Sequence, residues 1–242
     1  MGLYVYGIGA AAAGELLPIE GILGQPAFRL HSGPLAAVVS DCPLEIVRAE
    51  RKHIVASQRV LSRHNGELDL LPMAFGTVAQ SEVALRGFLD EYRDTLLAQL
   101  QRIAGRVEMS LQLSLDVADP IGHVVALTPA LQVARDRLFH HGRQPNHDER
   151  IRLGQLCDAA LTRYREAQLA QVLAIVAPLC AEISPLPLRA YSDIAQLAML
   201  VSRDRVGDFE AAVSDAAPQL ADDLAVTIGG PWPPHNFVQL EL

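Results

Sequence analysis

The amino-acid sequence predicts an α+β protein of two domains, and three observations lead to this prediction. Half of the 242 residues are hydrophobic, which is enough for a sizeable core in one large domain or two modest ones. Short apolar runs typical of strands are separated by longer segments in which apolar residues recur at helical spacing. A strand-like segment after Gly105 opens a second series of elements, so we place a domain boundary near this glycine.

The first domain, residues 1–105, is predicted to hold a mixed sheet with helices. Its strands are expected at 3–8, 27–31, 35–40 and within 68–79. Pro72 in the last stretch indicates an edge position or a bulge, because proline cannot donate a ladder hydrogen bond. Helices are expected at 44–64 and 82–104. Asp41 and Pro43 would start the first helix, Ser81 would cap the second, and Gly105 would end it.

The second domain, residues 106–242, is predicted to be a ferredoxin-like unit with an enlarged helical first crossover and a Pro-rich C-terminal segment. Residues 107–115 alternate between apolar and polar side chains, as a half-buried strand does. A loop is expected at 118–127, followed by a helical pair at 128–141 and 148–177. Strands at 186–192 and 194–201, a helix at 205–217 and a strand at 224–228 complete the order.

Composition excludes several classes of function. Lys and Arg number 20 and Asp and Glu 28, a net charge of −8 without a basic block, so we expect no nucleic-acid partner and no anionic membrane. The most apolar stretch, 169–181, is too short to span a membrane, and no signal peptide is apparent. Three scattered cysteines, Cys42, Cys157 and Cys180, indicate reduced thiols in a cytoplasmic protein.

The most informative segment is Gly-Gly-Pro-Trp-Pro-Pro-His-Asn-Phe-Val at 229–238, which contains the only tryptophan, Trp232. Three prolines fix φ and remove backbone donors, and two glycines let the chain turn. One interpretation is a strand that leaves its sheet and seals an edge of the core with Trp232. The other is a family signature.

The second interpretation comes from resemblance. The segment at 230–238 is similar to the C-terminal signature of the gas vesicle protein F/L family, in which we expect tyrosine where His235 stands. Blocks at 4–8, 34–40, 72–78 and 105–108 resemble the family in the same order along the chain. The strand after Gly105 departs from it, with Met109 and Leu113 where tryptophan and lysine are expected.

Other patterns favour chemistry less than structure. The loop 7–14 begins with Gly7 and Gly9, ends at Gly14 and resembles a dinucleotide fingerprint, with Ala12 in place of the third glycine. Pro18 cuts the segment that follows, so no full helix is left to bind a pyrophosphate. The histidines His140, His141 and His147 lie near acidic residues, yet adjacent helical side chains diverge, so a solvated turn is preferred to a metal site. Thr77, in the Phe-Gly-Thr block, has no base near it in sequence.

The resemblance implies a gas vesicle accessory or minor structural protein, located in the cytoplasm and at the gas vesicle. It implies binding to the hydrophobic shell subunit and to other accessory proteins, and a part in vesicle assembly. We expect no enzyme activity, no catalytic residues, no cofactor and no metal, and no partner-binding residue can be named. The alternative is an enzyme that binds a nucleotide or small molecule at the loop 7–14. The sequence does not separate F-type from L-type proteins.

Overall fold

The chain forms two compact units, which are described one at a time. The structure, a computed structural model, describes all residues except 12–17, 45–46, 66–68, 143, 221 and 240–242. Unit 1 comprises Met1–Met109, Leu200–Asp204 and Gly230–Leu242, and unit 2 comprises Ser110–Met199 and Arg205–Gly229. Whether residues 1–105 and 106–242 fold as separate domains stays a prediction.

Unit 1 is built on an antiparallel sheet. Its strands are β1 (Gly2–Ala10), β2 (Ala27–Ser32), β3 (Leu35–Cys42), β4 (Leu70–Pro72) and β5 (Val78–Ala79). The order is β2-β3-β1-β4, and β5 also pairs with β1. The short strand β4 lies at the end of this order, which confirms the edge position that Pro72 indicated. At the β2–β3 hairpin, Gly33 has a φ of 55° in the turn.

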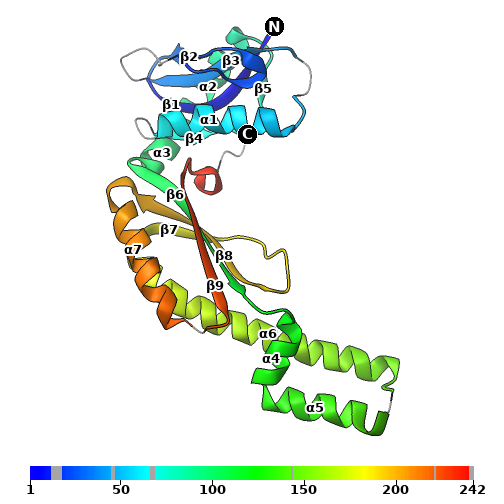
Figure 1. The fold of residues 1–242 in the computed structure, drawn as a ribbon. Coiled ribbons are helices and arrows are strands. Elements are labelled where there is room, and N and C mark those ends of the chain that lie inside the picture. The colour runs from blue at the N-terminus through cyan, green and yellow to red at the C-terminus, as the bar shows by residue number, and fades with distance from the viewer. Residues whose placement is uncertain (12–17, 45–46, 66–68, 143, 221, 240–242) are drawn as a thin grey trace. The chain divides into compact units, whose positions relative to one another are not determined.

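Helices cover both faces of this sheet (Figure 1). On one face, α2 (Glu82–Glu91) and α3 (Arg93–Ile103) pack on alternate residues of β1, including Leu3, Val5 and Ile8. On the other face, α1 (Arg51–Asn65) packs on Tyr4 and Tyr6. A register shift between Val5 and Gly7 explains why Ile8 joins the face of Val5, because an extra residue reverses the alternation.

The helices of unit 1 differ from the prediction at two places. The first begins at Arg51 rather than at residue 44, because Asp41 and Cys42 extend β3 and pair with β1 instead of starting a helix. The second is interrupted at Tyr92 and forms two helices. The predicted signals at its ends are confirmed, since the Ser81 side chain accepts a hydrogen bond from the Ala84 N–H and Gly105 has a φ of 67°.

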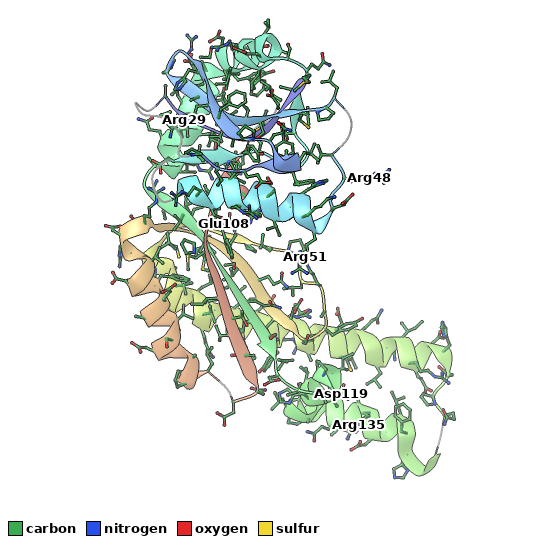
Figure 2. All side chains as sticks on the ribbon, turned by 45° about the horizontal axis from the view of Figure 1, so that its top comes forward. Arg29, Arg48, Arg51, Glu108, Asp119 and Arg135 are labelled. Atoms are coloured by element: carbon green, nitrogen blue, oxygen red, sulfur yellow. The ribbon has the colours of Figure 1, made fainter. Side chains whose placement is uncertain are left out.

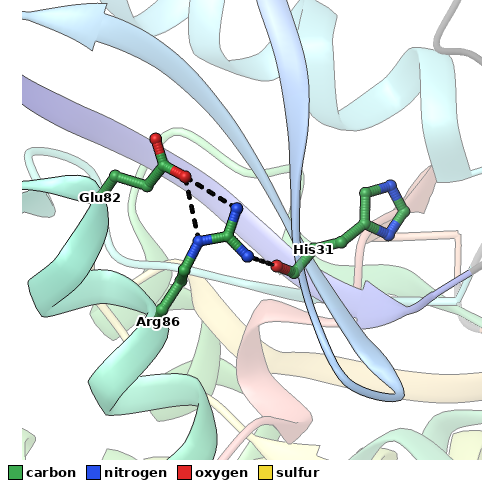
Figure 3. Close-up of polar contacts among 3 residues, drawn as sticks. All are labelled: His31, Glu82 and Arg86. Atoms are coloured by element: carbon green, nitrogen blue, oxygen red, sulfur yellow. Dashed lines mark hydrogen bonds and ion pairs between the residues drawn. The ribbon is translucent and has the colours of Figure 1, made fainter.

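One surface arginine joins α2 to the edge strand β2 (Figure 3). The Arg86 guanidinium donates to the Glu82 carboxylate, one turn earlier, from Nε at 3.0 Å and from Nη2 at 2.7 Å. Its Nη1 donates to the carbonyl oxygen of His31 in β2. The helix is therefore fastened to the edge of the sheet as well as to its face.

The second sheet has the order β7-β8-β6-β9. Its strands are β6 (Arg106–Leu115), β7 (Cys180–Pro185), β8 (Asp193–Ser202) and β9 (Leu224–Trp232). The first and third of these in chain order lie at the centre, as in a ferredoxin-like arrangement. The structure thus has the α+β class that the sequence predicts, with two sheets and with β9 at one edge.

In unit 2, α6 (His147–Val176) and α7 (Val206–Ala216) cover one face of the sheet (Figure 1). Residues from the sheet and both helices meet there, among them Leu111, Val176 and Val213. Two further helices, α4 (Pro120–Leu127) and α5 (Pro129–Phe139), pack on α6, and α5 lies antiparallel beside it. These three helices form the enlarged crossover.

Two predictions for unit 2 were wrong. The expected loop at 118–127 is mostly the helix α4, which Asp119 caps with its side chain and Pro120 starts. The strand expected at 186–192 lies earlier, at β7, because α6 ends at Val176 and the chain turns into the sheet at once. The long helix itself is confirmed, and a capping box between Asn146 and Glu149 fixes its start.

Candidate functional site

The candidate site is the C-terminal segment Gly230–Val238, together with the residues of unit 1 that hold it. Pro233 and Pro234 are buried, and Phe237, at the end of a short 3-10 turn, is 0% exposed. Val238 packs against the core formed with α2 and α3. The segment is therefore part of the packed structure of unit 1.

A buried carboxylate of β6, that of Glu108 (labelled in Figure 2), is bonded to this segment. Glu108 is 6% exposed although it belongs to the polar set of its strand. Its Oε2 accepts a hydrogen bond from the Asn236 N–H at 2.8 Å, and its Oε1 accepts one from Asn236 Nδ2 at 2.6 Å. Burial raises the pKa of the Glu108 carboxyl, and the two bonds from Asn236 offset part of that rise.

Two further contacts hold the segment, and together with the Glu108–Asn236 pair we call them the anchor. Arg102 Nη1 donates to the carbonyl oxygen of Phe237 at 3.2 Å. Gly230, with a φ of 123°, passes so close to β6 that a Cβ would lie 2.9 Å from the Glu108 carbonyl oxygen. Only glycine fits both the conformation and the space at this position.

The prediction that Trp232 seals a core edge was wrong. Trp232 is 45% exposed, and Phe237 takes the buried place. Pro231 and His235 are also exposed. The segment thus buries one aromatic ring and presents the other to the surroundings. No local pattern in the sequence tells which of the two rings, Trp232 or Phe237, is buried. In the structure, the hydrogen bonds between Glu108 and Asn236 hold the end of the segment that contains Phe237 against the protein.

The glycine-rich loop proposed for a nucleotide is strand over residues 7–10. Gly7 and Gly9 lie inside β1, which continues to Ala10. A Cβ at Gly7 would lie 2.9 Å from the Leu71 carbonyl oxygen, so this glycine allows close strand packing. Residues 12–14 of the proposed loop lie outside the described residues.

The remaining candidates have structural roles where the structure describes them. Gly76 has a φ of 90° with nothing within 4 Å of an added Cβ, so the backbone conformation of the turn requires this glycine. The Thr77 hydroxyl donates to the Ala74 carbonyl oxygen at 2.7 Å within that turn. Across the described residues, no three His, Cys, Asp or Glu side chains are placed to hold a metal ion.

A polar cluster in unit 2 was not found from the sequence. His123 of α4 pairs with Asp223, just before β9, and the Tyr164 hydroxyl of α6 donates to the same carboxylate at 3.3 Å. Burial, and then the Asp223 charge, raises the pKa of Tyr164 to about 12. The cluster joins three elements that are distant in sequence, and we assign it a structural role.

Comparisons with known proteins agree with this architecture. A family model described as "Gas vesicle synthesis protein GvpL/GvpF" matches residues 2–239. Gas vesicle protein F of a Streptomyces strain is 29% identical over 242 residues, which cover 99% of this chain and 100% of that protein. Gas vesicle protein L of the same strain is 25% identical over 231 residues, 93% of this chain and 80% of that protein.

Two crystal structures have the same fold. GvpF from Anabaena superposes with a TM-score of 0.88 at 22% identity, covering 100% of this chain and 99% of that one. GvpF from Microcystis aeruginosa gives 0.85 at 22% identity, covering 99% of each chain.

The fold and the matched length place the chain among the gas vesicle proteins. It belongs to the GvpL/GvpF family, which confirms the resemblance read from the signature blocks. Among the residues that the structure describes, no helix is long and apolar enough to cross a membrane.

Proposed function

We propose that the chain assists gas vesicle assembly by binding the hydrophobic shell subunit, and that Trp232 is the principal contact residue. The observation that carries this proposal is the 45% exposure of Trp232 on a segment whose other large ring, Phe237, is completely buried. Tryptophan is enriched among the residues that dominate binding energy at protein interfaces. Its place in the family signature supports the link to gas vesicle assembly.

The anchor makes such a contact favourable. The contacts of Glu108, Arg102 and Phe237 hold the backbone on the C-terminal side of the exposed ring, and the pairing of β9 with β6 holds the other side, so binding orders few additional groups. In addition, β9 lies at an edge of its sheet and ends at Trp232, so it offers backbone donors and acceptors to a further strand. A protein that binds a very hydrophobic subunit needs both an exposed apolar ring and unpaired backbone donors and acceptors.

The proposed role is non-catalytic, with other accessory proteins of the gas vesicle as further partners and the cytoplasm and the vesicle as its locations. The alternative, a nucleotide- or small-molecule-binding enzyme, depended on the loop 7–14. It loses support because Gly7 and Gly9 are strand residues with close neighbours on the adjacent strand.

The test is binding of the full chain to the purified shell subunit by biolayer interferometry. Trp232→Ala should weaken binding by at least about tenfold, in the range of interface hot spots. Phe139→Ala is the matched control, since Phe139 lies in α5 and is similarly exposed, at 47%. Equal affinities of the wild type and Trp232→Ala would refute the role of Trp232, and a wild type that does not bind would refute the shell subunit as partner.

A thermal-shift comparison addresses the alternative. The full chain is heated with and without ATP, GTP and NAD, and we expect the same midpoint in every case. A nucleotide that raises the midpoint in the wild type would favour the enzyme hypothesis, because a ligand that binds only the folded state stabilises it.

A further inference from the structure

A second surface of unit 1 combines basic side chains with a hollow that apolar residues line in part. The hollow, of about 430 Å³, lies beside the start of α1. Part of its lining is apolar (Leu23, Cys42, Pro43 and Val47) and part is polar (Arg48, Glu50 and His53). Arg48 and Arg51 extend from this end of the helix (Figure 2). We call the hollow and the outer side of α1 the basic groove.

The charge of this surface is opposite to that of the chain. Residues 45–65 contain five cations and two acids, a net charge of +3. Since the whole chain carries −8, the remaining residues carry −11. The cations are all exposed: Arg48, Arg51, Lys52, Arg59 and Arg63. Lys52 pairs with Glu50, whereas the four arginines form no ion pair with any residue that the structure describes. Sequence reasoning overlooked this run because the acids elsewhere dominate the total.

The cations oppose the stability of their own helix. Arg51 and Lys52 occupy the first turn, where the helix dipole is positive, and that turn contains no acid. Arg59 and Arg63 are four residues apart, so like charges lie side by side on the outer face. The opposite face is ordinary core, since Val60 and Leu61 are buried. An anionic partner would relieve both unfavourable arrangements.

Leu23 provides an independent sign of function. It has a φ of 55° and a ψ of 22°, in the left-handed region that leucine rarely adopts, and it is nevertheless 44% exposed. Strained residues that persist in a fold cluster at sites of function. Here the strained backbone holds an apolar side chain in the lining of the hollow.

We infer that the basic groove binds an acidic segment of a partner protein, one of whose apolar side chains enters the hollow beside Leu23. A protein segment supplies both the acids that match the arginines and an apolar group that matches the apolar part of the lining, Leu23, Pro43 and Val47. Nucleic acid and anionic lipid would meet few cations here and a strongly acidic remainder of the chain. The inference is independent of Trp232 and of the shell subunit.

The test uses the full chain and a synthetic peptide of glutamates with one central leucine, measured by isothermal titration calorimetry at low salt. Arg59→Glu with Arg63→Glu should weaken binding by at least about tenfold. Leu23→Asn should also weaken it, and asparagine tolerates the left-handed backbone, so the fold is kept. The matched control is Arg137→Glu with Arg152→Glu, which makes the same change in net charge at two exposed arginines of α5 and α6.

Several results would overturn the inference. One is a wild type that does not bind the peptide. Others are equal weakening by the control pair, or unchanged binding when alanine replaces the peptide's leucine. Tighter binding of single-stranded DNA or of phosphatidylserine vesicles would assign the groove to those ligands. Self-association in light scattering that the Arg59 and Arg63 changes abolish would assign it to a second copy of the chain.

Discussion

Replacing Asn236 by alanine should destabilise unit 1 in a pH-dependent way. The change removes the Nδ2 donor at 2.6 Å from Glu108 Oε1, while the backbone N–H at 2.8 Å from Oε2 remains. A hydrogen bond to a charged group contributes about 1.5–3 kcal/mol, and one to a neutral group about 0.5–1.5 kcal/mol. The cost should therefore be larger where Glu108 is ionised.

The sign of the pH dependence follows from the pKa of Glu108, which burial raises in the folded state. Its contribution to stability is fully present below the unfolded pKa of about 4.3 and is lost as the pH rises through the folded value. Asn236→Ala removes a hydrogen bond that lowers this pKa. The folded-state pKa of Glu108 therefore rises further, and the protein loses more stability as the pH increases. We expect a small cost at about pH 4.5 and the larger cost at about pH 8.

Urea unfolding followed by circular dichroism at both pH values measures the effect. The control is the same change in a Glu108→Gln background, where no carboxylate ionises and the cost of Asn236→Ala should be small and constant with pH. An equal cost at the two pH values, or an equal cost in the two backgrounds, would refute the role assigned to this pair.

Three further predictions follow from the geometry. Gly230→Ala should lower the unfolding free energy by about 1–3 kcal/mol, because a Cβ meets β6 and the φ is 123°. Burial alone would raise the pKa of Asp193, but bonds from two backbone N–H groups and two glutamine amides together lower it. The stabilisation from Asp193 is therefore present above the unfolded pKa of about 3.9 and is lost as the pH falls through the folded value. Asp193→Asn should lower the free energy of unfolding by about 1–3 kcal/mol near pH 7 and by less in acid. Absorbance titration should show one phenol near pH 12 that disappears in Tyr164→Phe and titrates earlier in Asp223→Asn.

Controls for these variants come from the same chain. Gly87→Ala in α2 has open space around the added Cβ and should be neutral or stabilising by up to about 1 kcal/mol, the opposite sign to Gly230→Ala. For Asp193→Asn, a cost that persists unchanged in acid would contradict the assigned hydrogen bonds. Unchanged titration in Asp223→Asn would contradict the contact with Tyr164.

The strands with clear alternation were predictable from sequence, whereas several boundaries were not. Residues 107–115 form β6 because the period of two marks a sheet with one face packed. The start of α1 was misplaced because Asp41 and Cys42 pair with Leu3 and Gly2, a contact across the sheet that local helix signals do not reveal. The strand expected at 186–192 was misplaced for a similar reason. Leu186, just after the end of β7, still donates its backbone N–H to the Gln196 carbonyl oxygen, and such a contact between strands is not visible in the local sequence.

The candidate site was predictable as a segment but not in its orientation. Its prolines and glycines indicate a rigid turn, and its only tryptophan suggested a core residue. The segment is held at Asn236 by Glu108, a residue 128 positions away in the chain. A pairing of that range depends on the tertiary fold, and composition does not encode it.

The single indole of this chain is also a built-in optical probe. Since Trp232 is partly in contact with water, its fluorescence emission should be red-shifted in the free protein. The emission should move to shorter wavelength when an apolar surface of a partner covers the ring. Encounters with candidate partners can therefore be followed without attaching a dye, and the spectrum of the unlabelled chain reports directly on the one side chain in question.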